Sequence, residues 1–324
     1  MTAIQTRGLT KYYGDTRGID DLSIEVEEGE VFGFLGPNGA GKTTTIRTLL
    51  GFVAPTGGSA TLLGRDVTDE ETLREAKRRI GYLPSTPGLD EGVTGERLIR
   101  YHAALKGDER SEQLLERFDP PVEREVGEYS TGNVQKLALV LTFMHDPDLV
   151  VMDEPTSGLD PLMQERLYEF IEEERDRGTT FFFSSHVLSE VRKVCDRVGI
   201  IRDGRLVAME GVEELLDRSG KRVSVSVAET LDPADFDIAG VHDLDASDGD
   251  ASFMFTGEYD ALLDHLQNYH IVDLDVEEAP LEDVFMKFYD DAPADAAEES
   301  AETRPGSGSG ATETAASAGG ETDA

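Results

Sequence analysis

A glycine-rich run near the N-terminus has the residue types and spacing of a phosphate-binding loop. Residues 36–43 match the pattern G-x-x-x-x-G-K-[ST]. Its glycines let the backbone point N–H groups at phosphate oxygens, and a following helix adds the positive end of its dipole. We expect Lys42 to reach the β- and γ-phosphates of a nucleotide and the Thr43 hydroxyl to ligate Mg²⁺. The predicted nucleotide contacts are Gly36, Pro37, Asn38, Gly39, Ala40, Gly41, Lys42, Thr43 and Thr44.

A pair of acids supplies a second candidate for phosphate chemistry. Asp153 and Glu154 directly follow the apolar run at residues 149–152. In this position Asp153 would hold the Mg²⁺ shell, and Glu154 could polarise an attacking water. Alone the pattern is weak, because many strands end in acids. Together with the glycine-rich loop it indicates a site for nucleotide phosphates and Mg²⁺.

These residues require elements that bring them to one edge of the fold. Apolar runs bounded by turn residues predict strands over 30–36, 148–155 and 179–186, and a helix after the glycine-rich loop. Each strand ends in polar residues. Because ligands bind at the carboxyl ends of parallel strands, we predict an α/β fold with a mostly parallel sheet.

With both motifs present, residues 4–215 resemble the nucleotide-binding subunit of an ATP-binding-cassette (ABC) transporter, which implies a P-loop NTPase core. The resemblance implies that Tyr13, 29 residues before Lys42, stacks on adenine. His186, 32 residues after Glu154, stands where the family has its switch histidine against the γ-phosphate. Glu154, His186 and Lys42 are thus the expected catalytic residues.

Two further segments match family motifs that act across a dimer interface. Residues 157–160, which end in Asp160, resemble the D-loop, which contacts the opposite subunit. The family signature LSGGQ reads Tyr-Ser-Thr-Gly-Asn over residues 129–133. Ser130 and Gly132 are kept and would face the ATP of the other subunit, although Ser130 could also simply cap its helix. Thr131 and Asn133 replace Gly and Gln, which leaves the identity of the site intact and the strength of binding across the interface open.

One departure from the family lies near the expected metal. The family has a Gln after the strand at residues 80–84, whereas this chain has Ser85. A hydroxyl can bind a metal-bound water, but it cannot span the gap that an amide spans. Ser85 is therefore a candidate metal-site residue beside Thr43 and Asp153, and an ordinary loop serine is the alternative.

The composition divides the chain into three zones. Residues 1–217 form the predicted nucleotide-binding domain, with a helical subdomain at about 86–145 that carries the signature. Residues 218–290 form a small α+β module. Its predicted strands are 222–227, 252–257 and 271–276, and its predicted helices are 259–269 and 281–289. Residues 291–324 lack Leu, Ile, Val, Met, Phe and Tyr, which predicts a disordered acidic tail.

Acidity is the main feature of the composition. Against 30 Lys and Arg stand 67 Asp and Glu, a net charge of −37. The excess runs through the whole chain, and only 8 of the basic residues are lysines, which resembles the proteins of salt-loving microbes. No apolar run reaches the roughly 18–20 residues of a membrane span. The single cysteine excludes an internal disulfide and a cysteine-built zinc site. We expect a cytoplasmic protein that reaches the inner face of the membrane through a partner.

The motif layout predicts a two-fold dimer, because one subunit cannot complete a site that needs the signature of another. Two ATP molecules would lie in the interface of a homodimer, or of a pair with a related ATPase subunit. Hydrolysis with Mg²⁺ would drive a separate membrane permease. Resemblance to type-2 exporters favours export. We do not expect nucleic-acid binding. The alternatives are a soluble ABC-type ATPase that acts on nucleic acid or ribosomes, and a nucleotide-dependent regulator without turnover.

Overall fold

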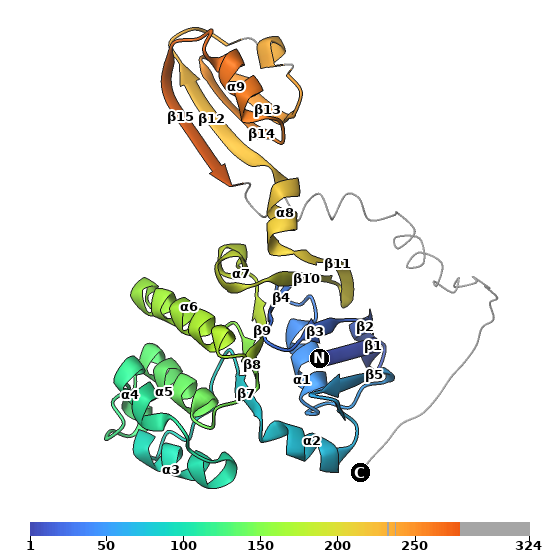
Figure 1. Cartoon of the computed structure of the whole chain (residues 1–324), viewed down its shortest axis with the longest axis vertical. Helices are drawn as coiled ribbons and strands as arrows, with labels where there is room; N and C mark the ends of the chain where they lie inside the picture. The colour runs from blue at the N-terminus through green and yellow to red at the C-terminus, as the bar shows by residue number, and fades with distance from the viewer. Residues whose placement is uncertain (232, 237, 279–324) are drawn as a thin grey trace, which may run out of the picture.

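The computed structural model describes residues 1–278 except 232 and 237 (Figure 1). The predicted helix at 281–289 and the predicted tail at 291–324 lie outside the described residues, so both stay predictions. None of the helices among the described residues is long and apolar enough to cross a membrane.

A six-stranded sheet in the order β11-β10-β4-β9-β8-β7 forms the centre of the N-terminal body, residues 1–211. Its strands are β4 (Val31–Leu35), β7 (Ile80–Leu83), β8 (Leu149–Asp153), β9 (Thr180–Ser185), β10 (Arg197–Arg202) and β11 (Arg205–Gly211). Only β11 pairs antiparallel; the other pairs are parallel. Every residue of β4, β8 and β9 is buried. Strands covered on both faces read as continuous apolar runs, which is why the sequence predicted these three.

A second sheet, which the sequence analysis did not predict, is antiparallel and has the order β2-β1-β5-β6, with β3 also paired to β1. Its strands are β1 (Thr2–Tyr13), β2 (Thr16–Leu22), β3 (Glu25–Glu27), β5 (Gly57–Leu62) and β6 (Arg65–Asp66). Apolar side chains of this sheet, such as Ile4 and Ile19, share one core with Phe34 and Phe182 of the central sheet. The two sheets therefore form one packed body around α1 (Lys42–Leu49) (Figure 1).

Helices flank the central sheet and form an arm at one side. Two helices lie against the body after β8 and β9: α6 (Pro161–Asp176) and α7 (Leu188–Val194). A further helix, α2 (Glu70–Lys77), precedes β7. The arm contains α3 (Gly95–Lys106), α4 (Ser111–Phe118), a 3₁₀ turn (Val126–Glu128) and α5 (Thr131–Phe143) (Figure 1). Nearly all of α5 from Gln135 onward is buried, and it packs in the same core as α6 and the central sheet.

The C-terminal module follows α8 (Val212–Ser219) and has its own core. Its antiparallel sheet has the order β13-β14-β12-β15. The elements are β12 (Lys221–Val227), a 3₁₀ turn (Pro233–Phe236), β13 (Val241–Ser247), β14 (Asp250–Phe255), α9 (Tyr259–Leu266) and β15 (Ile271–Glu278). Three strands and one helix lie where the sequence predicted them. The sequence analysis missed β13, because its run VHDLDAS is largely polar and exposed.

Candidate functional site

The glycine-rich loop joins β4 to α1 at the carboxyl end of the central sheet. Two of its glycines have no room for a side chain. A Cβ on Gly36 would lie 2.4 Å from the carbonyl oxygen of Ile201, and one on Gly41 would lie 2.7 Å from that of Gly18. Gly41 also has a φ of 112°, in the left-handed region that favours glycine. The loop therefore packs its backbone directly against β2 and β10.

Lys42 points back into this loop. Its Nζ donates to the carbonyl oxygens of Gly36 at 2.7 Å and Pro37 at 3.2 Å, and it lies 3.6 Å from Glu154 Oε1. Burial lowers the pKa of the Lys42 ammonium, and the charges of Glu154 and Asp153 oppose this shift. The ammonium is thus held at the centre of the loop beside an acid from another strand.

The acids after β8 meet groups from the loop and from β9. Asp153 is buried and accepts hydrogen bonds from Ser184 Oγ at 2.6 Å and from Thr43 Oγ1 at 3.1 Å. Glu154 Oε1 lies 3.0 Å from His186 Nδ1. Glu154 adopts a φ of 51°, and its N–H donates to the Ser184 carbonyl oxygen. Three strand ends thus bring Lys42, Glu154 and His186 together.

A pocket of about 320 Å³ opens over the loop. Of the predicted nucleotide contacts it is lined by Tyr13, Pro37, Asn38, Gly39, Gly41, Lys42, Thr43 and Thr44. Glu154 lines it too, whereas Gly36 and Ala40 lie behind the loop surface. Thr16, Arg17 and Gly18 of β2 complete the wall, and the sequence analysis missed all three. They carry no motif of their own and reach the pocket only because β2 pairs with the end of β1.

The residues predicted to act across a dimer lie outside this pocket. Ser130 caps α5 and accepts from the N–H of Asn133, and Asp160 caps α6 and accepts from the N–H of Met163. Gly132 follows Ser130 in the first turn of α5. A Cβ placed on Gly158 would lie 2.8 Å from the Thr131 methyl group, so the signature and the D-loop segment touch within one chain.

Ser85 is exposed and lies two residues beyond the end of β7. It does not line the pocket over the glycine-rich loop. Its neighbours Pro84, Pro87 and Leu89 line a different cavity of about 390 Å³ at the base of the arm. Among the described residues no hydrogen bond joins Ser85 to Thr43 or Asp153, so its metal role stays a prediction.

Two buried polar residues near the site were missed by sequence reasoning. Gln135 of α5 is 2% exposed, and its Nε2 donates to the Pro155 carbonyl oxygen at 2.9 Å. Glu190 of α7 is 8% exposed and accepts from Thr156 and Ser185. The available signal was a polar residue among apolar ones on a buried helix face. That signal predicts that the residue forms a buried hydrogen bond, but it does not predict which group is the partner.

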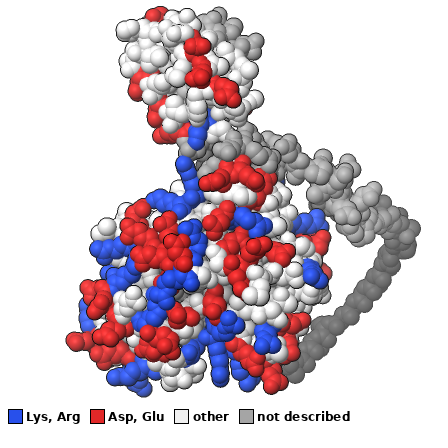
Figure 2. All heavy atoms as spheres, in the orientation of Figure 1, with Lys and Arg blue, Asp and Glu red and all other residues white. Residues whose placement is uncertain are grey.

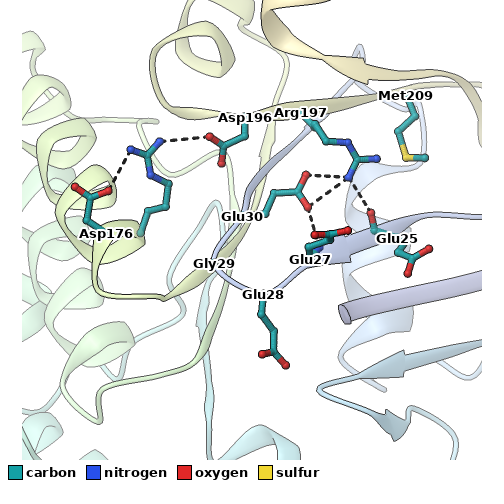
Figure 3. Close-up of a pocket in the computed structure, with 10 residues that line it drawn as sticks. Glu25, Glu27, Glu28, Gly29, Glu30, Asp176, Asp196, Arg197 and Met209 are labelled. Carbon is teal, nitrogen blue, oxygen red and sulfur yellow. Dashed lines mark hydrogen bonds and ion pairs between the residues drawn. The ribbon is translucent and has the colours of Figure 1, made fainter. Parts of the chain in front are cut away.

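Another pocket, of about 760 Å³, lies at the opposite edge of the central sheet (Figure 3). It surrounds the segment before β4 and the start of β10. Its arginines already have partners in the wall: Arg197 lies 3.0 Å from Glu30, and Arg175 lies 3.4 Å from Asp196. Six acids line this pocket against its two arginines, so the wall is net negative and would repel a phosphate.

The site thus combines a backbone cradle with a buried ammonium and two acids. Thr43 Oγ1 and Asp153 Oδ2 are oxygen donors of the kind that Mg²⁺ prefers, and they lie 3.1 Å apart. Mg²⁺ is commonly held by one or two protein groups together with substrate phosphates, so this pair fits the ion. Glu154 faces the same pocket with one carboxylate oxygen near both Lys42 and His186. This arrangement suits the transfer of a phosphoryl group to water.

Comparison with known proteins agrees with this geometry. The profile of the family described as "ABC transporter" matches residues 19–157. The bacitracin transport ATP-binding protein of Bacillus licheniformis is 35% identical over 70% of this chain and 76% of its own length. The Nod factor export ATP-binding protein I of Cupriavidus pinatubonensis is 33% identical over 89% of this chain and 91% of its own.

Solved structures share the fold of the N-terminal body. The ATP-binding subunit of an ABC transporter superposes with a TM-score of 0.61 at 30% identity, over 67% of this chain and 93% of that one. A dimeric cassette in a post-hydrolysis state with ADP and phosphate superposes with a TM-score of 0.60 at 19% identity, over 64% and 98%. The predicted α/β nucleotide-binding fold is confirmed.

Proposed function

The chain belongs to the ATP-binding subunits of ABC transporters, and from this premise we propose that its strand-end pocket binds and hydrolyses ATP with Mg²⁺ to power export through a separate permease. The observation that carries the proposal is the convergence of Lys42, Glu154 and His186 from three strand ends. The bacitracin and Nod factor relatives support the role in export. They do not identify the substrate of this chain.

Each residue has a role in the proposed reaction. Lys42 and the loop N–H groups hold the phosphates, and Lys42 stabilises charge that develops on the transferred group. Glu154 accepts the proton of the attacking water, and His186 orients the Glu154 carboxylate through the 3.0 Å contact. Thr43 and Asp153 would hold Mg²⁺, which supplies charge neutralisation on the phosphate oxygens when bound. Tyr13 is 47% exposed at the pocket rim, where a base can stack.

The proposed enzyme is a two-fold dimer. Ser130, Gly132 and Asp160 lie outside the pocket of their own chain. The first two belong to the helix start of α5, which can present a hydroxyl and N–H groups to a phosphate of a second subunit. The dimeric post-hydrolysis cassette supports this arrangement at the level of fold.

A surface at the base of the arm is the proposed contact for the permease. The 390 Å³ cavity there has apolar walls that include Leu50, Phe52 and Leu141. Two of the chain's few lysines, Lys77 and Lys106, also line it, and no acid does among the described residues. Burial, followed by repulsion from Lys77, lowers the pKa of Lys106 to about 8. An apolar, cationic cavity in such an acidic chain suits a partner segment that is apolar and acidic. Attachment to the inner membrane face follows from this contact.

Salt adaptation stays a prediction. Acidic and basic side chains are intermixed over the face of the N-terminal body shown in Figure 2. A net charge of −37 implies self-repulsion that salt would screen. We therefore specify about 1 M KCl for the assays, where the screening length is about 3 Å.

The substitution Glu154→Gln tests the proposal. Loss of the general base should slow turnover by a factor of about 10²–10⁴. ATP binding should persist, so the variant should accumulate as a closed dimer with ATP and Mg²⁺. Phosphate release and light scattering measure the two effects. Glu169→Gln, which removes an exposed acid of α6, is the matched control and should behave as the native protein. A folded Glu154→Gln protein that stays monomeric with ATP contradicts the dimer, and native turnover in it contradicts the assigned base.

A further inference from the structure

Glu190 connects the two segments that follow β8 and β9. Its carboxylate accepts a hydrogen bond from Thr156 Oγ1 through Oε1 and one from Ser185 Oγ at 2.6 Å through Oε2. Thr156 comes two residues after Glu154, and Ser185 directly precedes His186. All three members of this bridge are buried, with exposures of 8%, 5% and 1% for Glu190, Thr156 and Ser185. The bridge therefore joins, out of water, the chain segments that carry the proposed base and its histidine.

Within the part of the chain that the structure describes, the carboxylate of Glu190 is buried without a cation beside it, unlike the buried carboxylate of Glu174. Among the described residues Glu190 has no ion pair within 4 Å, and only two hydroxyl groups hold it. The equally buried Glu174 instead accepts two hydrogen bonds from the Arg110 guanidinium. A buried carboxylate without a cation is destabilising unless its hydrogen bonds are strong. Hydrogen bonds to an ionised acceptor are about twice as strong as neutral ones. The charge on Glu190 thus fixes both hydroxyls firmly.

The segment after Thr156 is the one that reaches toward the dimer interface. Residues 157–160 are the proposed D-loop, and they begin one residue beyond the bridge. On the other side, Ser185 also accepts from the N–H of Val187, so its position fixes the backbone on both sides of His186. A shift of the D-loop therefore pulls on Thr156, Glu190 and Ser185 in turn.

We propose that Glu190 is a positioning residue for ATP hydrolysis. It transmits the state of the D-loop to His186, so that docking of the second subunit sets the contact between His186 and Glu154. This inference rests on the proposed function, since it requires ATP hydrolysis in a dimer. The bridge itself touches no substrate.

A set of variants that cut the bridge at different points tests this role. Glu190→Ala should lower kcat about 10–100-fold, as expected for lost hydrogen bonds to a charged group, and should leave KM for ATP within about two-fold. Thr156→Val and Ser185→Ala should each lower kcat about 10-fold, and the double variant should be no slower than the slower single one. In the Glu190→Ala background neither substitution should have a further effect. Glu190→Gln keeps the shape and one acceptor, so it should recover part of kcat.

Two controls separate positioning from general damage and from a failure of the proposed function. Glu174→Gln alters an equally buried carboxylate outside the site, and it should lower Tm while kcat of the folded protein stays within two-fold of native. In the Glu154→Gln background, Glu190→Ala should still form the ATP-dependent dimer. If the native protein neither hydrolyses ATP nor forms an ATP-dependent dimer, the proposed function itself is wrong. Native kcat in both Glu190 variants overturns the inference, and so do additive effects of Thr156→Val and Ser185→Ala. If Glu190→Ala does not fold, the Thr156, Ser185 and Glu190→Gln variants decide.

Discussion

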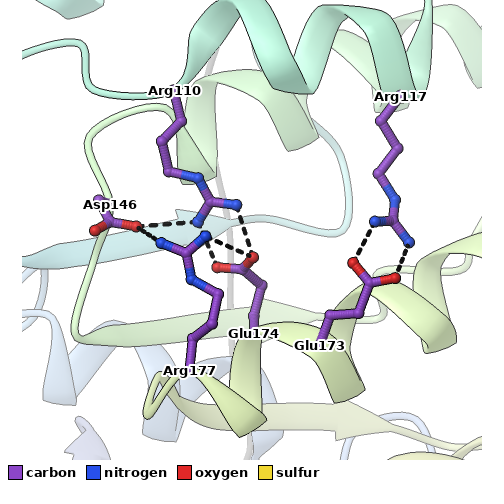
Figure 4. A network of polar contacts seen from close by, with 6 residues as sticks. All are labelled: Arg110, Arg117, Asp146, Glu173, Glu174 and Arg177. Atoms are coloured by element: carbon purple, nitrogen blue, oxygen red, sulfur yellow. Dashed lines mark hydrogen bonds and ion pairs between the residues drawn. The ribbon is translucent and has the colours of Figure 1, made fainter.

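The strand-end site and the root of the helical arm both bury carboxylates, but they balance that charge in opposite ways. We use "arm root" for the network of Arg110, Asp146, Glu174 and Arg177 (Figure 4). There the Glu174 carboxylate, 2% exposed, receives both ends of the Arg110 guanidinium at 2.5 and 2.7 Å. Asp146 lies 3.0 Å from Arg110 and 3.1 Å from Arg177. Every acid of the arm root therefore has a cation.

In the strand-end site Glu154 lies beside Lys42, but two buried acids have hydroxyl partners instead of cations. Asp153 is held by Thr43 and Ser184, and Glu190 by Thr156 and Ser185. The nearby cation is Lys42, and its pKa is lowered by burial even though the acids oppose the shift. In the arm root every acid is paired with a cation, and these pairs hold two elements together. In the strand-end site the negative charge is only partly balanced, so it stays available to interact with a ligand. Bound phosphate and its metal ion would complete the charge balance that the chain leaves open.

Breaking the arm root should give the largest effect on stability. Arg110→Met removes both guanidinium hydrogen bonds of the buried Glu174 carboxylate and leaves it only Arg177, 4.0 Å away. Loss of one partner of a buried ion pair typically lowers the free energy of unfolding by about 3–5 kcal/mol. ATP affinity of the folded protein should stay within two-fold of native. Denaturant unfolding in high salt and nucleotide titration measure both. The matched control is Arg117→Met, whose pair with Glu173 is partly exposed and should be worth about 0–1 kcal/mol. Equal losses from the two variants would show that burial does not distinguish the pairs.

The arm root should also weaken at acid pH through His145, the neighbour of Asp146. His145 is 8% exposed, and its Nε2 lies 3.2 Å from the Ile80 carbonyl oxygen. Its Nδ1 has no hydrogen-bond partner among the described residues. Burial, and then repulsion from Lys106, lowers the pKa of His145 from 6.5 to about 4. The unfolded chain therefore takes up the proton first, so stability falls as pH drops from about 6.5 to about 4. At about 1.4 kcal/mol per pKa unit, the loss is about 3 kcal/mol.

A His145→Met variant isolates this contribution, because the carboxylates titrate in both proteins alike. Lys106 Nζ also donates to the Ile80 carbonyl oxygen, so that oxygen keeps a partner in the variant. The difference in unfolding free energy between the two proteins should change by about 3 kcal/mol between pH 7 and pH 4. Parallel pH curves would show that His145 does not titrate as the arm packing implies.

Replacing a buried cation by Met should have opposite effects in the two regions. In the arm root it should lower stability and spare ATP binding, whereas in the strand-end site it should weaken ATP binding and spare stability. Lys42→Met removes a buried ammonium that contacts phosphate in the proposed complex. ATP affinity should fall about 10–100-fold, the range expected for lost hydrogen bonds from a charged group. Stability without nucleotide should change little, because burial already disfavours the charged form. Nucleotide titration and unfolding of the Arg110→Met and Lys42→Met pair give the comparison directly. Native ATP affinity in Lys42→Met would remove the assigned role.

Sequence reasoning succeeded where the determinant is local. The glycine-rich loop is a contiguous pattern, and β4, β8 and β9 read as strands because both of their faces are buried. The antiparallel sheet was missed because β1 mixes Thr, Arg and Gln with its apolar residues, and pairing with β5, not its own periodicity, sets its place.

The positions of Gln135 and Glu190 could not be read from the sequence for a related reason. Each bonds to segments that are distant in the chain or follow another strand: Gln135 to Pro155, and Glu190 to Thr156. No spacing rule predicts such pairs, because they depend on how helices pack on the sheet. The metal role of Ser85 depended on a motif position alone, and it stays a prediction.

The smallest effect should come from Ser85, which lies two residues beyond the carboxyl end of β7. It follows β7, the strand beside β8, and its neighbours Pro84 and Pro87 line the cavity proposed for the permease. A Gln at this position can make a hydrogen bond toward the site or the permease, worth a factor of about 2–10 in rate. Ser85→Gln should therefore change permease-stimulated turnover by that factor and basal turnover by less than two-fold. The measurement is ATPase rate in high salt with and without the reconstituted permease. Thr86→Gln places the same side chain one residue further along and should change neither rate. If Ser85→Gln scales both rates alike, Ser85 acts on the chemistry of the site and not on its coupling to the arm.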